Sequence, residues 1–263
     1  MGKSVFITGA AAGIGRATAR RFAELGYTVG GYDLDEAGLA TLATEITALG
    51  GTPVTGHLDV TDYAELSQRI TEFTAATGGR LDLLINNAGI LRSGRFPDID
   101  ITAQQRMIDI NCKGVTNGCH AAYPALRDTP GATVINLCSA SAIYGQPELA
   151  VYSASKFFVR GLTEALDLEW GADDIRVIAM WPLYVQTAMT DGVHTGTTAS
   201  LGVNLTAEDV VAAIVAAAEP GPLQRLLHVV HFPVGRQTAL MAGAVRFSPA
   251  WLTRLVNKRL ARL

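Results

Sequence analysis

The chain has 263 residues, enough for one large α/β domain or two small ones. Apolar residues make up 49% of the sequence and charged residues 17%, so a large core can form. The formal net charge of −3 gives no bias toward nucleic acid, and we expect no nucleic-acid partner. No run approaches the ~18 apolar residues of a membrane-spanning helix, and the first apolar run is too short for a secretion signal.

The cysteines are Cys112, Cys119 and Cys138, an odd number without a CxxC pair. This pattern suits a reduced intracellular protein, so a cytoplasmic location is expected. A metal cluster that includes His120 is conceivable, but the spacing matches no common zinc pattern. Small buried thiols are the simpler interpretation, and no metal site is expected.

Short apolar runs alternate with helical patterns. In chain order, the expected elements are strand 4–8, helix 14–25, strand 28–32, helix 36–49, strand 53–58, helix 63–76, strand 81–86, helix 102–126, strand 132–138, helix 151–170 and strand 176–180. This alternation predicts an α/β fold, with a single Rossmann-type, doubly wound parallel sheet flanked by helices on both faces. Without a linker or an internal repeat, residues 1–263 are expected to form one domain.

The last third is less regular. Residues 206–209 are expected to start a helix that continues over 210–218, with Thr206 as its N-cap and Asp209 in its first turn. Residues 226–232 are expected to form a final strand. Residues 220–263 contain no Asp or Glu but several arginines and lysines. Pro249 is expected to open a terminal helix.

That terminal helix has an apolar face and a basic face. The apolar side chains are Leu252, Leu255, Val256, Leu260 and Leu263, and the basic ones are Arg254, Lys258 and Arg262. Such a helix can rest on a membrane or a partner, and it can also pack on its own subunit or an oligomer partner with its basic face in water. Charge runs are usually solvated, which favours packing but leaves open a peripheral membrane contact through 249–263.

A glycine-rich loop, TGAAAGIG (8–15), lies between the first expected strand and the first expected helix. Gly9, Gly13 and Gly15 would let the backbone approach a pyrophosphate at the helix N-terminus. A glycine loop alone is a weak signal, but this position favours a dinucleotide site over a plain turn.

Asp33 ends the second expected strand, where an acid would bind the adenosine ribose hydroxyls. A carboxylate there repels a 2′-phosphate, which predicts NAD rather than NADP. The alternative is a helix N-cap, since Leu34, Asp35 and Glu36 follow. NNAG (86–89) ends the fourth strand at the crevice where parallel sheets bind ligands, although it could equally be a turn.

Tyr152 and Lys156 lie four residues apart, on one face of an expected helix. An ammonium beside a phenol favours the phenolate and lowers the tyrosine pKa. Because such pairs also occur by chance, the pair alone does not establish an active site.

Taken together, these motifs resemble the classical short-chain dehydrogenase/reductase family. The matching segments are TGAAAGIG (8–15), Asp59-Val60, NNAG (86–89), Asn111, Ser139 and YSASK (152–156). Ser139 precedes Tyr152 by the interval usual in the family. The resemblance covers about residues 3–190 and fades over the last third of the chain, where the family varies with substrate. Residues 184–263 are expected to form the substrate loop and a variable C-terminal region.

The resemblance implies a catalytic group of Asn111, Ser139, Tyr152 and Lys156. Tyr152 would be the general acid/base, and Lys156 would hold the nicotinamide ribose and lower the Tyr152 pKa. Ser139 would orient the substrate oxygen, and Asn111 would hold a water that links Lys156 to solvent.

It also implies bound NAD. The implied cofactor-binding residues are Gly9, Gly13, Ile14, Gly15, Asp33, Asp59, Val60, Asn87, Ala88, Gly89, Tyr152, Lys156, Pro182 and Thr187. Asp59 and Val60 would contact the adenine, and Thr187 the nicotinamide carboxamide. Leu183 stands where the family commonly has glycine, and a positive φ would be costly there.

The expected substrate pocket is mostly apolar. Its expected wall residues are Leu91, Phe96, Ile143, Tyr144, Tyr184 and Met189, and its few charged neighbours are Arg92, Arg95 and Glu148. An apolar pocket favours a lipophilic substrate. With the activity that the resemblance implies, the expected function is an NAD-dependent oxidoreductase that interconverts a lipophilic secondary alcohol and a ketone. The alternative is an NAD(H)-sensing or scaffold protein on the same fold, which would have no need of Ser139, Tyr152 and Lys156. The resemblance also implies a homodimer or homotetramer.

Overall fold

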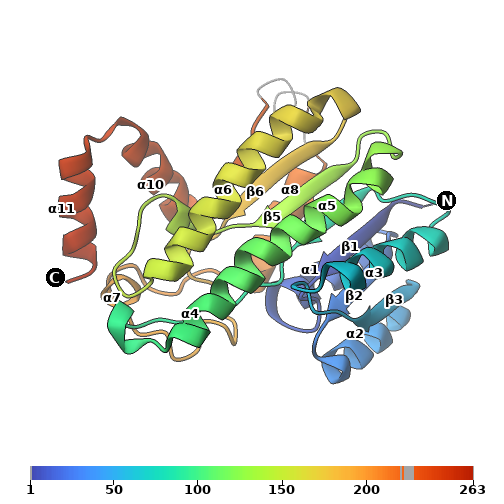
Figure 1. Cartoon of the computed structure of the whole chain (residues 1–263), viewed down its shortest axis with the longest axis horizontal. Coiled ribbons are helices and arrows are strands. Elements are labelled where there is room, and N and C mark those ends of the chain that lie inside the picture. The colour runs from blue at the N-terminus through green and yellow to red at the C-terminus, as the bar shows by residue number, and fades with distance from the viewer. Residues whose placement is uncertain (1, 220, 222–227, 263) are drawn as a thin grey trace.

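The computed structural model describes residues 2–219, 221 and 228–262. Within these residues, seven parallel strands form one sheet in the order β3-β2-β1-β4-β5-β6-β7. The strands are β1 (Ser4–Thr8), β2 (Thr28–Asp33), β3 (Pro53–His57), β4 (Leu83–Asn86), β5 (Thr133–Leu137), β6 (Arg176–Trp181) and β7 (His231–Pro233). The predicted Rossmann-type sheet is confirmed (Figure 1).

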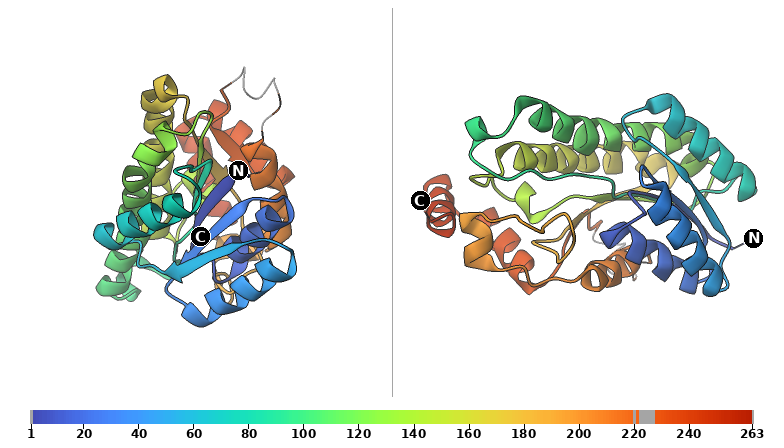
Figure 2. Two further views of the ribbon diagram at one scale, coloured as in Figure 1. Left: turned by 90° about the vertical axis from the view of Figure 1, so that its right-hand side faces the viewer. Right: turned by 90° about the horizontal axis from the view of Figure 1, so that it is seen from below.

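Helices cover both faces of the sheet, as the right-hand view of Figure 2 shows. One layer consists of α1 (Gly13–Glu24), α2 (Glu36–Ala48) and α8 (Ala207–Ala218), and the other of α3 (Tyr63–Ala76), α5 (Gly114–Arg127) and α6 (Ala150–Trp170). Strand β1 is buried on both faces because its side chains alternate: Val5 and Ile7 pack in the first layer and Phe6 in the second. Apolar runs without polar alternation therefore fold as central strands.

The order of the strands reverses between β1 and β4. In a doubly wound sheet, the crevice for a ligand opens at this switch point, beyond the carboxyl ends of the strands. The segments that follow β1, β4, β5 and β6 all begin at this edge, and they carry the glycine loop, NNAG, Ser139 and Pro182.

The helix expected over 102–126 contains a π-helical turn. Helix α4 (Ile101–Ile108) leads into π-helical Asp109–Lys113, and α5 continues from Gly114. Asn111 lies in this turn and is fully buried. Such single π-helical turns are often found at functional sites.

Expectations for the last third hold in part. Thr206 caps α8 and exchanges hydrogen bonds with Asp209, as predicted. The strand expected over 226–232 is shorter, since β7 begins at His231; residues 226 and 227 lie outside the described part. Helices α7 (Gly196–Leu201) and α10 (Arg236–Phe247) were not expected, because neither has a clear apolar period.

Helix α11 (Ala250–Leu260) begins directly after Pro249, as predicted, but its expected single apolar face is divided. Leu252 and Leu260 are partly buried, whereas Leu255 and Val256 are exposed. Leu263 lies outside the described residues. None of the helices in the described part is long and apolar enough to cross a bilayer.

Candidate active site

The glycine loop after β1 is shaped by close backbone contacts. Gly9 has φ +67° and Gly13 has φ +52°, a region that favours glycine. A Cβ at Gly9 would lie 2.8 Å from Ala88 Cα, and one at Gly15 would overlap the Gly9 carbonyl oxygen. The loop can therefore turn into α1 only with glycine at these positions.

The N-terminus of α1 faces the pocket without a side-chain cap. Ala12 is the N-cap residue and makes no side-chain capping hydrogen bond, and the first turn has no acidic residue. The first backbone N–H groups of a helix need acceptors, and together with the helix dipole they favour an anion. The loop and helix therefore fit the pyrophosphate that the sequence predicted.

Asp33 lines the same pocket, and its carboxylate is anchored by two backbone groups. It accepts hydrogen bonds from Ala11 N–H at 3.0 Å and Asp35 N–H at 3.1 Å. The alternative role as a helix N-cap is wrong, because Asp35 caps α2 through Gly38 N–H. Asp33 is thereby fixed at the end of β2, beside the glycine loop.

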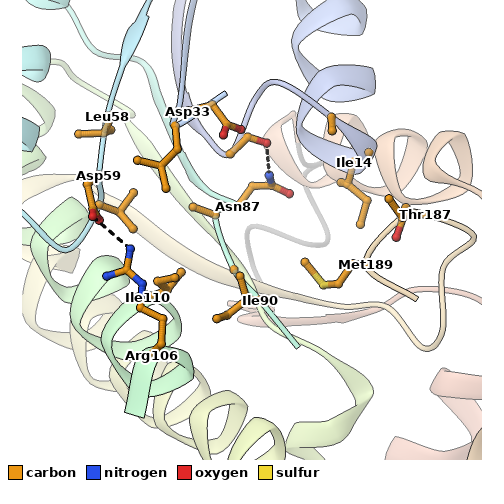
Figure 3. A pocket seen from close by; sticks show the side chains of 18 residues that line it. Ile14, Asp33, Leu58, Asp59, Asn87, Ile90, Arg106, Ile110, Thr187 and Met189 are labelled. Carbon is orange, nitrogen blue, oxygen red and sulfur yellow. Dashed lines mark hydrogen bonds and ion pairs between the residues drawn. The ribbon is translucent and has the colours of Figure 1, made fainter. Parts of the chain in front are cut away.

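The pocket has a volume of about 280 Å³ and runs along the switch point. Figure 3 shows Leu58 and Asp59 at one end, and Ile14, Thr187 and Met189 at the other.

Asp59 forms an ion pair with Arg106, with 3.1 Å between the carboxylate oxygen and Nη2. Burial would raise the pKa of Asp59, but hydrogen bonds from Thr61 and Arg106 outweigh it and hold the pKa below its usual value.

Asn87 holds the two loops together rather than pointing freely into the pocket. Its side-chain amide donates to Thr8 O at 3.0 Å and Gly9 O at 2.8 Å. The hydroxyl of Thr8 in turn accepts from Asn87 N–H and Ala88 N–H, both at 3.1 Å. Together these bonds fix the segment after β4 against the glycine loop.

Asn111 reaches the same edge from the π-helical turn. Its Oδ1 accepts from Ile90 N–H and its Nδ2 donates to Ile90 O, both at 2.9 Å, and Nδ2 also donates to Ser155 Oγ at 3.2 Å. The side chain is thus a positioning group between the segment after β4 and α6. Its role in holding a water stays a prediction.

The ammonium group of Lys156 lies against one face of the Tyr152 ring. Its Nζ donates to Leu137 O at 2.8 Å and lies over the tyrosine ring, 5.5 Å from the ring centroid. Burial lowers the pKa of Lys156 because the ammonium is desolvated. The amine is therefore oriented by β5 and adjoins both Tyr152 and Gly89.

Burial raises the pKa of Tyr152 to about 12, and a hydrogen bond with Ser139 opposes the rise. The net shift is set by burial and Ser139, and the expected effect of Lys156 on this pKa stays a prediction. The ammonium lies over the ring face, and desolvation of the phenolate dominates. Ser139 sits just beyond β5, where its hydroxyl accepts from Ser141 N–H at 3.1 Å.

Tyr152, Ser139 and Lys156 line a second cavity of about 80 Å³. This cavity shares wall residues with the nucleotide pocket: Ile14, Asn87, Gly89, Ile90, Thr187 and Met189. The phenol and the pocket at the switch point thus adjoin, and a proton and a hydride could be exchanged with one substrate carbon there.

The sequence matches the family model described as short chain dehydrogenase over residues 3–197. This chain belongs to the short-chain dehydrogenase family. Membership agrees with the sheet order, the glycine loop and the position of Tyr152 and Lys156 on α6.

Two curated relatives illustrate the range of the family. A 3-oxoacyl-[acyl-carrier-protein] reductase of Thermotoga maritima is 35% identical over 190 residues, 72% of this chain and 77% of the relative. A 3-alpha-(or 20-beta)-hydroxysteroid dehydrogenase of Mycobacterium bovis is 37% identical over 194 residues, 73% of each chain. Among solved structures, carveol dehydrogenase of Mycobacterium avium in complex with NAD has a TM-score of 0.80 at 26% identity, covering 91% of this chain and 98% of that one.

Only part of the expected substrate wall of this dehydrogenase faces the cavity. Leu91, Tyr184 and Met189 line it as expected. Ile143 and Tyr144 are instead buried in the core, and Phe96 is exposed on a short 3-10 turn. The direction of each side chain in these loops depends on tertiary contacts that an apolar composition does not reveal.

Leu183 also differs from expectation. Positive φ outside glycine occurs, within the described residues, at Glu148, Asp174, His228 and Arg262, so Leu183 carries no such strain. Its side chain is half-buried and lines the cavity beside Tyr184. The residue is accommodated as part of the substrate wall.

Sequence reasoning missed two positioning residues. Thr8 anchors the segment after β4, and Arg106 neutralises Asp59 at the far end of the pocket. Thr8 is the last residue of the apolar strand β1 and the first residue of the glycine-rich segment, which was an available signal. Arg106 is distant in sequence, and no local pattern indicates its partner.

Proposed function

We propose that this dehydrogenase uses NAD to interconvert a lipophilic secondary alcohol and its ketone, with Tyr152 as general acid/base. The observation that carries the proposal is the shared wall between the cavity of Tyr152, Ser139 and Lys156 and the nucleotide pocket. An acid/base group must lie within reach of the reacting oxygen, while the same carbon faces the hydride carrier.

The residues of the pocket fit NAD. Gly9, Gly13 and Gly15 with the uncapped N-terminus of α1 would hold the pyrophosphate, and the Asp33 carboxylate would accept the ribose hydroxyls. A fixed carboxylate at that place disfavours a 2′-phosphate. The complex of carveol dehydrogenase with NAD supports the same choice.

The cofactor, when bound, supplies the hydride acceptor or donor. In alcohol oxidation Tyr152 accepts the hydroxyl proton, and in ketone reduction it returns a proton to the oxygen. Ser139 would hold the same oxygen through its hydroxyl, and Lys156 would bind the nicotinamide ribose and orient the phenol. Asp59, Val60, Pro182 and Thr187 would contact the remaining parts of the cofactor.

The raised pKa of Tyr152 gives the pH dependence a definite sign. Oxidation needs the phenolate, which is scarce at neutral pH when the pKa is about 12. The rate of oxidation should therefore rise with pH, by up to about tenfold per pH unit below the pKa of the working complex. Ketone reduction uses the neutral phenol and should stay nearly flat over the same range.

A lipophilic substrate is supported by the cavity walls. Leu91, Leu149, Tyr184 and Val193 form a buried apolar cluster, and Tyr152 and Leu183 pack against it. The cavity at Tyr152 holds only the reacting end of a molecule. An adjoining cavity of about 360 Å³ next to Leu91 can take the rest, and its mixed walls also include Arg92, Ser93 and Asp191. The names of the hydroxysteroid and carveol dehydrogenases point to the same class.

The test is the initial rate of NADH formation with secondary alcohols from short polyols to sterols. Tyr152→Phe should lose at least about 100-fold in rate while NADH binding persists. Tyr144→Phe is the matched control, because the Tyr144 hydroxyl is buried without a hydrogen-bond partner in the described part of the chain. Removing it should leave the rate unchanged.

Other outcomes distinguish the alternatives. A protein that binds NADH but oxidises no alcohol in the panel would favour the sensing or scaffold function. A polyol as the best substrate would contradict the lipophilic assignment. Tyr152→Phe with full activity would remove Tyr152 as the acid/base.

We further infer a homodimer or homotetramer, which Phe157, Phe158 and Leu168 on α6 support by being exposed. The cytoplasmic location stays a prediction.

A further inference from the structure

The last two helices expose a group of large apolar side chains, here called the C-terminal face. Its members, with their exposed fractions, are Leu240 (74%), Phe247 (86%), Trp251 (68%), Leu255 (55%) and Val256 (49%). Single exposed apolar residues are ordinary, but a cluster of this kind indicates an interaction surface.

Helices α10 and α11 are packed on the rest of the subunit through their other sides, so the exposed side chains do not reflect a detached segment. Met241 and Val245 of α10, and Leu260 of α11, pack against the main core cluster. Leu240 and Phe247 are two turns apart on α10, and Trp251 and Leu255 one turn apart on α11, so each helix presents one outward stripe. Packing on its own subunit therefore accounts for only half of the apolar surface.

Cations surround the C-terminal face. Residues 220–263 contain no Asp or Glu. The exposed cations on α10 and α11 are Arg236, Arg246, Arg254, Lys258 and Arg259. As far as the described residues show, none of these forms an ion pair. The surface thus joins uncovered apolar side chains to uncompensated positive charge.

We propose that the C-terminal face docks on an anionic phospholipid bilayer, with α10 and α11 lying along the surface. Phe247 and Trp251 enter the boundary between head groups and acyl chains, and Arg254 and Lys258 contact lipid phosphates. Long basic side chains can extend to the phosphates while their stems lie along apolar surface. The positive charge and the apolar area then both contribute to membrane binding.

A second copy of the chain fits this surface less well. In a two-fold interface the same face meets itself, so the cations of one copy would oppose those of the other. No acidic residue in 220–263 could neutralise them. A bilayer with anionic head groups supplies that neutralisation.

The docking face lies at the substrate end of the molecule. Figure 1 places α11 beside α7, at the end opposite the N-terminus. Asn257 donates to Gly145 O at 2.6 Å, and Arg262 donates to Ala199 O at 3.0 Å. Helix α11 is therefore attached to the segments that follow Ser139 and Tyr184. Docking would bring the proposed substrate cavity close to the lipid surface. This consequence rests on the proposed function, whereas the docking proposal itself does not.

The experiment is co-sedimentation of the full chain with vesicles of phosphatidylcholine alone or mixed with phosphatidylglycerol. Binding is expected only with the anionic vesicles, and it should weaken with salt, since exposed charges are screened over about 10 Å at 0.1 M. The double variant Phe247→Asp/Trp251→Asp should lower the partition coefficient at least about tenfold. Arg254→Glu/Lys258→Glu should do the same.

Leu25→Asp/Leu49→Asp is the matched control, because it adds the same two charges at exposed leucines that end α1 and α2, and it should leave binding unchanged. The fluorescence of Trp251 also reports how deeply this side chain enters the bilayer. Lipids brominated on the acyl chain should quench the fluorescence of the wild type, and Trp251→Phe should bind equally but lose this quenching.

Several results would overturn the proposal. These are equal binding of wild type and the double aspartate variant, equal binding to neutral and anionic vesicles, or no binding at all. Light scattering provides the remaining test: if the aspartate variant dissociates an oligomer and keeps its vesicle binding, the face is an interface between copies. None of these readouts uses activity, so failure here is separate from failure of the proposed function.

Discussion

The nucleotide pocket and the C-terminal face are built in opposite ways. In the pocket, polar side chains such as Asp33, Asn87 and Asp59 are bonded to neighbouring loops of the same chain. On the C-terminal face, Phe247 and Trp251 are exposed, and the cations of the same helices form no ion pair within the described part of the chain. The polar groups of the pocket find their partners within the chain, whereas the apolar and charged groups of the C-terminal face can be covered only by another molecule.

This contrast indicates which substitutions should matter without a partner. Changes in the pocket should alter the isolated protein, because its contacts are internal. Changes on the C-terminal face should alter little until the outside surface is present.

The largest effect is expected at Gly15. Its substitution by Val places atoms where the Gly9 carbonyl oxygen lies, so the loop must move. NADH binding, measured by nucleotide fluorescence, should fall below detection while circular dichroism shows a folded protein.

Gly161→Ala is the control for this change. A Cβ at Gly161 meets nothing within 4 Å, and alanine favours a helix by up to about 1 kcal/mol. If Gly15→Val binds NADH normally, the close contact between Gly15 and the Gly9 carbonyl oxygen does not determine the shape of the nucleotide-binding loop.

A smaller effect is expected at Asp33. Asp33→Asn keeps an acceptor for Ala11 N–H but removes the charge, so repulsion of a 2′-phosphate is lost. The ratio of kcat/KM for NADP to that for NAD should rise about tenfold, equivalent to about 1.4 kcal/mol.

Asp35→Asn is the matched control, since it makes the same change two residues further on. Asp35 caps α2, a role that asparagine also fills well. Equal changes in cofactor preference from both variants would mean that net charge, rather than the position of Asp33, determines the choice.

The sequence predicted the sheet and the cofactor loop because their signals are local. Gly9 follows the end of β1, Gly15 lies in the first turn of α1, and Asp33 ends β2. The alternation of strands with helices indicates a parallel sheet. Ser139, Tyr152 and Lys156, which the resemblance implies as catalytic residues, lie around one cavity. Their individual roles stay predictions, as does the division into a core over about 3–190 and a variable region.

What could not be predicted depends on tertiary contacts. The π-helical turn at Asn111 and the ion pair of Arg106 with Asp59 join elements that are distant in sequence. The pKa of Tyr152 was expected to fall, but burial raises it, and burial cannot be read from the spacing of Tyr152 and Lys156. The divided apolar face of α11 has the same origin, since only the fold decides which side meets the core.

The smallest effect is expected at Phe247. Because this side chain is 86% exposed, Phe247→Asp should change the free energy of unfolding in urea by less than about 0.5 kcal/mol. Phe73→Ala sets the scale, since Phe73 is fully buried and should lose about 3–5 kcal/mol. A loss at Phe247 close to that at Phe73 would mean that another copy already covers the face in solution. With no loss in solution and a loss of vesicle binding, the face is completed only by lipid.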